Sequence, residues 1–279
     1  MNEMVKMKLL SVLLALFIFL TVSAVHGQIG GLSASKLATL NTETVPKFTI
    51  EFEPSFVFGY SSQYWDHEGQ KKSLFKNSDS LQVDSEMDFR FTYGLTPHWE
   101  IGFTVPSDMT FLSFGSKYRF WEKEKFTLAI LNGFNLPLGD HVYHITNRHN
   151  VQNEYDINLL LGLAATYEFN QKFSIDVNPV LQGHLDRGFT HLAQHLDVFF
   201  NMDLGYYLLD GFQGVIGLYY FMMENGLDNH KAQKFTINPG FTLEKARHFI
   251  AVMNFPFDIW GKSIENRIGV GFALTIWIN

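Results

Sequence analysis

The sequence predicts an all-β fold: a transmembrane, antiparallel, up-and-down β-barrel of about twelve strands. Three observations support this prediction. Apolar and polar residues alternate with period two over long segments, which is typical of strands and not of helices. Several of these segments exceed ten residues, whereas strands of soluble domains average about five or six. The connections between the segments alternate between short and long, as they do in outer-membrane barrels.

The clearest alternation lies in the hairpin at 155–182. The apolar face of its first strand runs at every second position from Tyr155 to Phe169, and it restarts at Phe173 after a polar turn. A tilted strand needs roughly nine to eleven residues to cross a bilayer. Aromatic residues at the ends of the apolar face form the girdle expected where lipid meets water. We therefore interpret this hairpin as transmembrane.

The same pattern recurs along most of the chain. It predicts strands at 48–60, 83–93, 99–105, 112–120, 126–136, 155–169, 173–182, 196–206, 215–223, 235–243, 249–259 and 264–278. We place the short connections near 95–98, 121–125, 169–172, 209–211 and 244–247 in the periplasm, and the longer ones near 61–81, 139–153, 185–194 and 225–232 outside the cell. A soluble β-sandwich or a lipocalin-like barrel is the alternative, but neither needs so many outward phenylalanines.

Three regions are predicted along the chain. Residues 1–27 have the features of a cleaved secretory signal peptide, because lysines precede an apolar run at 9–20 and small residues end just before Gln28. The alternative, a retained anchor helix, needs about 20 apolar residues. Residues 28–46 are small and polar, and we expect them to lie in the periplasm or to plug the lumen in part. Residues 47–279 form the predicted transmembrane barrel.

Composition fits an exported protein and excludes several classes of site. The chain has no cysteine, which excludes a disulfide framework and a thiolate metal site. Its net charge of −7 gives no sign of nucleic-acid binding. The partners that we expect are outer-membrane lipids, periplasmic chaperones, the barrel-assembly machinery and a small-molecule substrate.

We expect no cofactor and no metal site. Histidines do gather in or beside two outer loops, and imidazole is a good ligand for zinc or copper. They are His141, His144, His149, His184, His191 and His195. None of them shows the tight spacing of a helical metal motif.

Short motifs resemble a known family. Residues 42–47 ahead of the first strand, the strand at 114–120 and the strand end at 136–139 resemble the outer-membrane family labelled as transporters of the phenol meta-cleavage pathway, the phenol degradation family. This resemblance implies a barrel that takes up small, often aromatic compounds. The chain departs from the usual barrel-assembly signal because it ends in Asn279, and its last aromatic residue, Trp277, stands two places earlier.

Charged residues on the inward face of the strands are the candidate lumen lining. They are Glu51, Glu53, Asp84, Glu86, Asp88, Arg90, Lys117, Arg119, Asp156, Asp176, Asp203, Glu265 and Arg267. In a narrow barrel such charges can pair with one another and fill the lumen. Alternatively, an acidic lining favours cations or neutral polar solutes. Lys117 and Arg119 would then form a local basic step opposite the acidic strand at 83–93.

Prolines and one doubly apolar strand suggest a second route. Six prolines fall in or at the ends of predicted strands, where they either form bulges or open a gap in the wall; they are Pro54, Pro106, Pro137, Pro179, Pro239 and Pro256. The strand at 215–223 is apolar on both faces. An apolar substrate that leaves sideways could bind along Ile216, Leu218, Tyr220 and Met222.

The predicted function is that of an outer-membrane channel or porin-like transporter for small molecules, including aromatic or otherwise apolar compounds, which works by passive diffusion and is not an enzyme. One alternative is a structural or surface-interaction barrel with a sealed lumen. Another is an outer-membrane lipid hydrolase with a Ser, His and Asn constellation. The chain contains no His-x-Ser-Asn-Gly run of the kind that such a hydrolase would carry.

Overall fold

The computed structural model describes residues 29–33, 36–76, 80–138, 157–185, 192–223, 230–245 and 249–278. Over these ranges the chain forms fourteen strands and no helix. Accordingly, no helix in the described ranges is long and apolar enough to cross a membrane. The predicted signal peptide, Asp156 and the histidines at 141, 144, 149 and 191 lie outside the described residues.

The strands follow one another around a single sheet. They are β1 (Ile50–Trp65), β2 (Lys71–Ser73), β3 (Gln82–Thr96), β4 (Trp99–Pro106), β5 (Phe111–Lys123), β6 (Phe126–Pro137), β7 (Ile157–Asn170), β8 (Phe173–Leu185), β9 (Leu192–Leu209), β10 (Phe212–Met223), β11 (Ala232–Lys245), β12 (Phe249–Asn254), β13 (Phe257–Lys262) and β14 (Ile264–Ile278).

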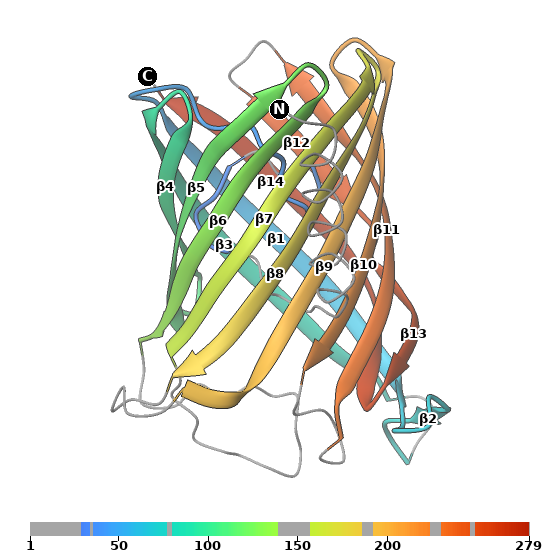
Figure 1. The fold of residues 1–279 in the computed structure, drawn as a ribbon. Coiled ribbons are helices and arrows are strands. Elements are labelled where there is room, and N and C mark those ends of the chain that lie inside the picture. The colour runs from blue at the N-terminus through green and yellow to red at the C-terminus, as the bar shows by residue number, and fades with distance from the viewer. Residues whose placement is uncertain are drawn as a thin grey trace, which may run out of the picture.

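The sheet closes into a barrel because its last strand pairs with its first. β14 runs antiparallel to β1, from Ile50 opposite Ile278 to Trp65 opposite Ile264. β12 and β13 are two parts of one interrupted strand between β11 and β14, and β2 pairs with the end of β1. Within the described residues the ring therefore has twelve strands, as the sequence predicted. The short connections lie at one end of the barrel and β2 lies at the other (Figure 1).

Proline position explains the interrupted strand. The ladder stops at Phe255 and Pro256, between β12 and β13, because proline has no backbone N–H to donate. The sequence analysis predicted one continuous strand at 249–259 and did not predict the interruption at Phe255 and Pro256. Pro54, Pro179 and Pro239 lie inside continuous strands, while the other two prolines, at 106 and 137, end theirs.

The barrel is apolar outside and polar inside. Leu161 and Phe272 are 54% and 49% exposed on the outer surface, whereas the charged side chains of Lys117 and Asp203 are fully buried. This is the reverse of a soluble protein, and it is stable only where the outer surface meets lipid. The outer surface is therefore suited to face lipid, as in outer-membrane barrels, whose short turns lie on the periplasmic side.

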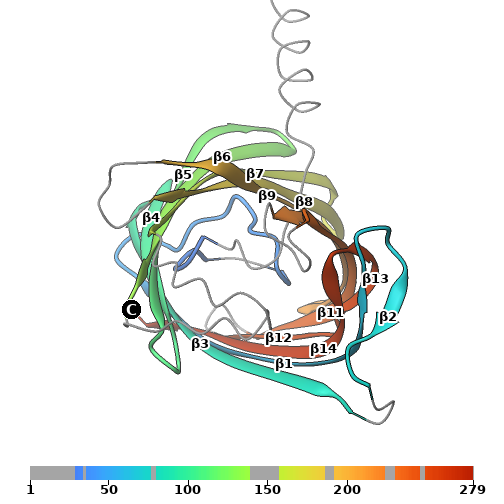
Figure 2. The same cartoon turned by 90° about the horizontal axis from the view of Figure 1, so that it is seen from below.

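Residues 29–33 and 36–45, which we call the inner segment, lie inside the ring (Figure 2). Ile29, Leu32 and Leu40 are each less than 5% exposed, and they form one apolar cluster with inward side chains such as Leu131 and Phe199. The hydrophobic core of this protein is thus built between the inner segment and the barrel wall.

Candidate functional site: the lumen

The inner segment is hydrogen-bonded to seven strands, β3 to β5 and β7 to β10. On one side of the lumen, Gly31 donates its backbone N–H to Thr104 Oγ1 (2.8 Å) and accepts at its carbonyl from Thr92 Oγ1 (2.7 Å). On the other side, Asn178 Nδ2 donates to the Leu40 carbonyl (2.6 Å). Nearly all buried backbone groups in proteins are paired, and here the wall supplies many of the partners of a segment that has no ladder of its own.

A buried ion pair lies where two parts of the inner segment meet β4 and β5. Glu100 and Lys117 are both fully buried, and Lys117 Nζ lies 3.0 Å from Glu100 Oε1. The Glu100 carboxylate also accepts from the backbone N–H groups of Ser33 (2.8 Å) and Val45 (2.7 Å). Lys117 Nζ donates to the Ser33 carbonyl (2.9 Å). One ion pair therefore fixes two points of the segment that are twelve residues apart.

Two aspartates hold the middle of the inner segment to the opposite wall. Asp203 on β9 accepts from the backbone N–H groups of Leu37 (3.0 Å) and Thr39 (3.3 Å). Asp176 on β8 lies 2.6 Å from Lys36 Nζ. Both carboxylates are fully buried, where a charge is stable only if it is paired and hydrogen-bonded. The inner segment supplies partners to both.

A row of glycines lets the start of the inner segment lie directly on the wall. Gly102, Gly115 and Gly133 are neighbours in register on β4, β5 and β6, and their missing side chains would point into the lumen. A Cβ atom on Gly102 would lie 2.0 Å from the Gly31 carbonyl oxygen, and one on Gly115 would lie 2.2 Å from that of Gly30. Any larger residue in this row would displace the segment.

A cavity of about 240 Å³ lies between the inner segment and the wall formed by β1, β3 and β9 to β14. Leu37 and Ala38 of the inner segment line one side of it. The wall contributes acidic side chains, basic side chains, three amides and apolar groups; they include Glu53, Glu86, Asp88, Asp258, Lys234, Arg267, Asn201, Asn238, Asn254, Tyr219, Phe199 and Val252.

Charges of both signs line this cavity. Glu53, Glu86 and Asp88 lie on the neighbouring strands β1 and β3, while Lys234 and Arg267 lie on β11 and β14. Lys234 Nζ is 3.0 Å from Asp258 Oδ2. The lining is thus acidic on one side and mixed on the other, which favours solutes that carry dipoles.

Three acceptor oxygens on the cavity wall have no hydrogen-bond partner among the described residues: Asp88 Oδ1, Asn238 Oδ1 and Asn254 Oδ1. Asn238 is only 2% exposed. Because a buried polar atom without a partner is costly, these oxygens are suited to accept from a solute that carries hydroxyl or amino hydrogens.

The first and last strands are also joined by side chains that face the lumen, which we call the seam clasp. Arg90 on β3 lies 2.8 Å from a carboxylate oxygen of both Glu51 and Glu53 on β1. Both carboxylates also accept from β14: Trp277 Nε1 donates to the second oxygen of Glu51 (2.5 Å), and Thr275 Oγ1 donates to the same Glu53 oxygen that Arg90 contacts. The clasp uses charges that the sequence placed in the lumen, and it pairs them with one another.

The predicted lumen residues fall into distinct environments. Glu51, Glu53 and Arg90 form the clasp, and Asp176, Asp203 and Lys117 hold the inner segment. Glu53, Glu86, Asp88 and Arg267 line the cavity, and Glu265 accepts from Gln82 Nε2 (3.0 Å). Asp84 lies two residues before Glu86 on the same strand face.

Lys117 and Arg119 do not form the basic step that the sequence predicted. Lys117 is neutralised by Glu100, and Arg119 lies near the periplasmic turn, where it donates to the Pro97 carbonyl (2.9 Å) and is 3.6 Å from Glu122. Neither side chain therefore offers a free positive charge to the cavity.

The proposed apolar path faces away from the lumen. Along β10, Gln213, Val215, Gly217 and Phe221 are buried, whereas Ile216 is 49% exposed, and Leu218, Tyr220 and Met222 share the face of Ile216. These four residues contact the membrane side and do not line the cavity.

Several residues of the site were missed by the sequence analysis. Lys234, Asn238 and Asp258 are inward residues on strands where only the outward apolar face was followed. The glycine row carried a readable signal, because Gly102, Gly115 and Gly133 all have inward parity on successive strands.

In the described part of the chain, no three His, Asp or Glu side chains are grouped so that they could hold a metal ion. The Nε2 atom of His184, one of the loop histidines, lies 2.9 Å from Asp197 Oδ2. The side chain of His195 lies outside the described atoms. The absence of a metal site stays a prediction.

Comparisons with known proteins agree with this fold. Residues 102–265 match the family described as “Putative MetA-pathway of phenol degradation”. An outer membrane channel from Pseudomonas putida F1 is 14% identical and has a TM-score of 0.62, and the match covers 85% of this chain and 98% of that one. The NanC porin is 5% identical and has a TM-score of 0.54, with 81% of this chain and 98% of that one covered. A search of curated proteins finds no match.

Proposed function

Because this chain belongs to the family described as “Putative MetA-pathway of phenol degradation”, we propose that it is an outer-membrane channel that passes small molecules by passive diffusion. The observation that carries this proposal is the cavity of about 240 Å³ between the inner segment and the wall. It contains both apolar and polar groups, and it lies inside a closed barrel that resembles channels and porins. We propose no catalytic role for any residue.

The lining supports small molecules with a flat apolar body and a few polar hydrogens. Phe199, Val252 and Leu37 supply apolar surface, while Asn238 and Asn254 present oxygens without partners. Aromatic compounds with hydroxyl groups have this combination. The family description points to the same kind of compound.

The inner segment favours a second candidate, a barrel with a sealed lumen. Its hydrogen bonds reach seven strands, and its apolar residues form the core. If the segment never leaves its place, the cavity is a closed space and the protein serves as a structural or surface-interaction barrel.

Conductance of the folded protein in a planar bilayer separates the two candidates. A channel should show stable current steps, and catechol should produce more frequent blockades of this current than an aliphatic diol of similar size. Absence of current from protein whose folding is shown by a heat-dependent gel shift would contradict passive diffusion and support the sealed barrel.

A further inference from the structure

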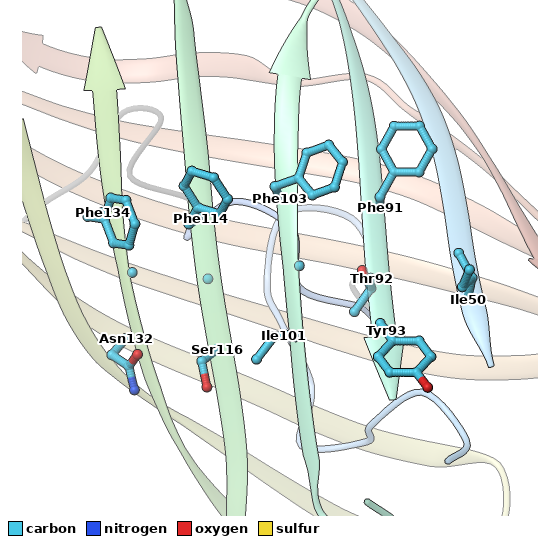
Figure 3. A pocket seen from close by; sticks show the side chains of 13 residues that line it. Ile50, Phe91, Thr92, Tyr93, Ile101, Phe103, Phe114, Ser116, Asn132 and Phe134 are labelled. Carbon is cyan, nitrogen blue, oxygen red and sulfur yellow. The ribbon is translucent and has the colours of Figure 1, made fainter. Parts of the chain in front are cut away.

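A second cavity, of about 550 Å³, lies on the outer face of the barrel over β1 and β3 to β6 (Figure 3). It is a groove between two rows of outward side chains that run across the strands in register. One row is Phe91, Phe103, Phe114 and Phe134; the other is Ile50, Tyr93, Ile101, Ser116 and Asn132. The groove lies on the opposite side of the wall from the lumen.

The glycine row explains why the groove exists. The floor between the two rows is formed by Thr92 and by the three glycines Gly102, Gly115 and Gly133. Their Cβ directions point into the lumen, so only backbone lies between the rows on the lipid side. In the second row Ser116 stands between Ile101 and Asn132, and its short side chain leaves the space open (Figure 3).

The phenylalanine wall is ordered by ring contacts. The ring centroids of Phe91 and Phe103 are 5.0 Å apart, those of Phe103 and Phe114 are 6.3 Å apart, and those of Phe114 and Phe134 are 4.9 Å apart. Aromatic pairs at such distances stabilise one another beyond their burial. The groove is therefore preformed, and its volume lies in the range of about 300–1,000 Å³ that is usual for ligand sites.

The position of the groove identifies the chemistry of its occupant. Ile101, Phe103 and Phe134 are 36–39% exposed within the apolar outer band, which faces hydrocarbon. Ile101 is two residues from the start of β4 at a periplasmic turn, so the groove lies in the periplasmic half of the membrane. Its lining is almost wholly apolar, and the Ser116 hydroxyl already accepts from Trp99 Nε1 (2.8 Å).

A positive charge lies beside one end of the groove. Lys47 is exposed at the periplasmic end of β1, and its backbone pairs with Gly94, the residue after Tyr93. We propose that the groove binds one acyl chain of a phospholipid from the periplasmic leaflet, with the phosphate of this lipid near Lys47. Apolar walls hold the chain, and the lysine attracts the charged headgroup.

Native mass spectrometry of the folded full-length chain with dioleoyl phosphatidylglycerol tests this proposal. Ser116→Phe fills the groove and should reduce the lipid-bound fraction about tenfold. Ala165→Phe is the matched control, because it adds the same ring to the lipid-facing side of β7, on the face of Tyr167 and away from the groove. The control should retain lipid as the parent does.

Two further arms keep the test decisive. Asn132→Phe fills another part of the groove and replaces Ser116→Phe if that variant fails the gel-shift test of folding. Lys47→Gln should weaken retention of phosphatidylglycerol but not of dioleoylglycerol, which has no phosphate. Equal lipid retention by the groove and control variants would overturn the proposal. So would a parent dimer that the groove variants abolish, since the occupant would then be a second copy of the chain.

Discussion

Replacing Glu100 by alanine should loosen the inner segment and increase conductance. The change leaves Lys117 buried without its partner, and it removes the acceptor of the Ser33 and Val45 backbone N–H groups. Breaking a buried ion pair by removing one partner costs about 3–5 kcal/mol. Hydrogen bonds to charged groups contribute about 1.5–3 kcal/mol each.

The part of this cost that concerns the inner segment sets the expected size of the effect. Two lost hydrogen bonds to a carboxylate weaken the seated segment by about 3–6 kcal/mol. About 1.4 kcal/mol corresponds to a factor of ten. The fraction of molecules whose inner segment has left its place should therefore rise about a hundredfold or more. Larger or more frequent current steps should therefore appear in planar bilayers.

Two controls accompany this measurement. Glu122→Ala removes an exposed carboxylate 3.6 Å from Arg119, and it should leave conductance unchanged because exposed ion pairs contribute little. Glu100→Gln keeps an acceptor oxygen and should give an intermediate result. If Glu100→Ala folds, as judged by the gel shift, and conducts like the parent, then the inner segment does not limit passage and the reasoning fails.

Three other predictions follow from the cavity, the glycine row and an outer turn. Arg267→Gln should increase the preference of the channel for cations, which the reversal potential in a salt gradient measures; an unchanged potential would remove Arg267 from the conducting path. Gly102→Val should unseat the inner segment and make it sensitive to protease, because the Cβ would lie 2.0 Å from a backbone oxygen, whereas Gly214→Val should not, since its nearest neighbour is 3.6 Å away. Hydrogen bonds from the Lys72 side chain and from backbone N–H groups lower the pKa of Asp66 from 3.8 to about 2. The hydrogen bonds that this carboxylate accepts from its turn should therefore persist above pH 3.8 and be lost as the pH falls through about 2. Amide exchange of the turn, measured between about pH 5 and about pH 1, tests this expectation. Loss of protection already above pH 3.8 would contradict it.

The strands were predictable because their chemistry is local. Alternation of apolar and polar residues gives a strand in any long segment, and all twelve predicted strands overlap a strand of the barrel. The break at Pro256 was not predicted, because Pro54 and Pro239 show that proline also fits inside a continuous strand. Whether a proline interrupts the ladder depends on the neighbouring strand, which the local sequence does not reveal.

The site was less predictable, because it depends on pairing across the lumen. The inward parity of Lys117 was correct, but its partner Glu100 and the Ser33 carbonyl lie 17 and 84 residues away in the chain. Parity alone cannot tell a charge that lines water from one that holds a buried segment. The apolar residues of the inner segment follow no helical or strand period, and nothing in its own pattern shows the seven strands that it contacts.

The seam clasp bears on how the barrel forms. Trp277 and Glu51 are 226 residues apart in the chain, so the last strand can meet the first only after nearly the whole sheet has formed, and contacts of such separation form slowly. A slip of β14 by one residue would turn Trp277 and Thr275 toward lipid and deprive both carboxylates of these donors. Only closure in the correct register gives each of these side chains its partner on the opposite strand, so the polar contacts at the seam favour the correct final pairing.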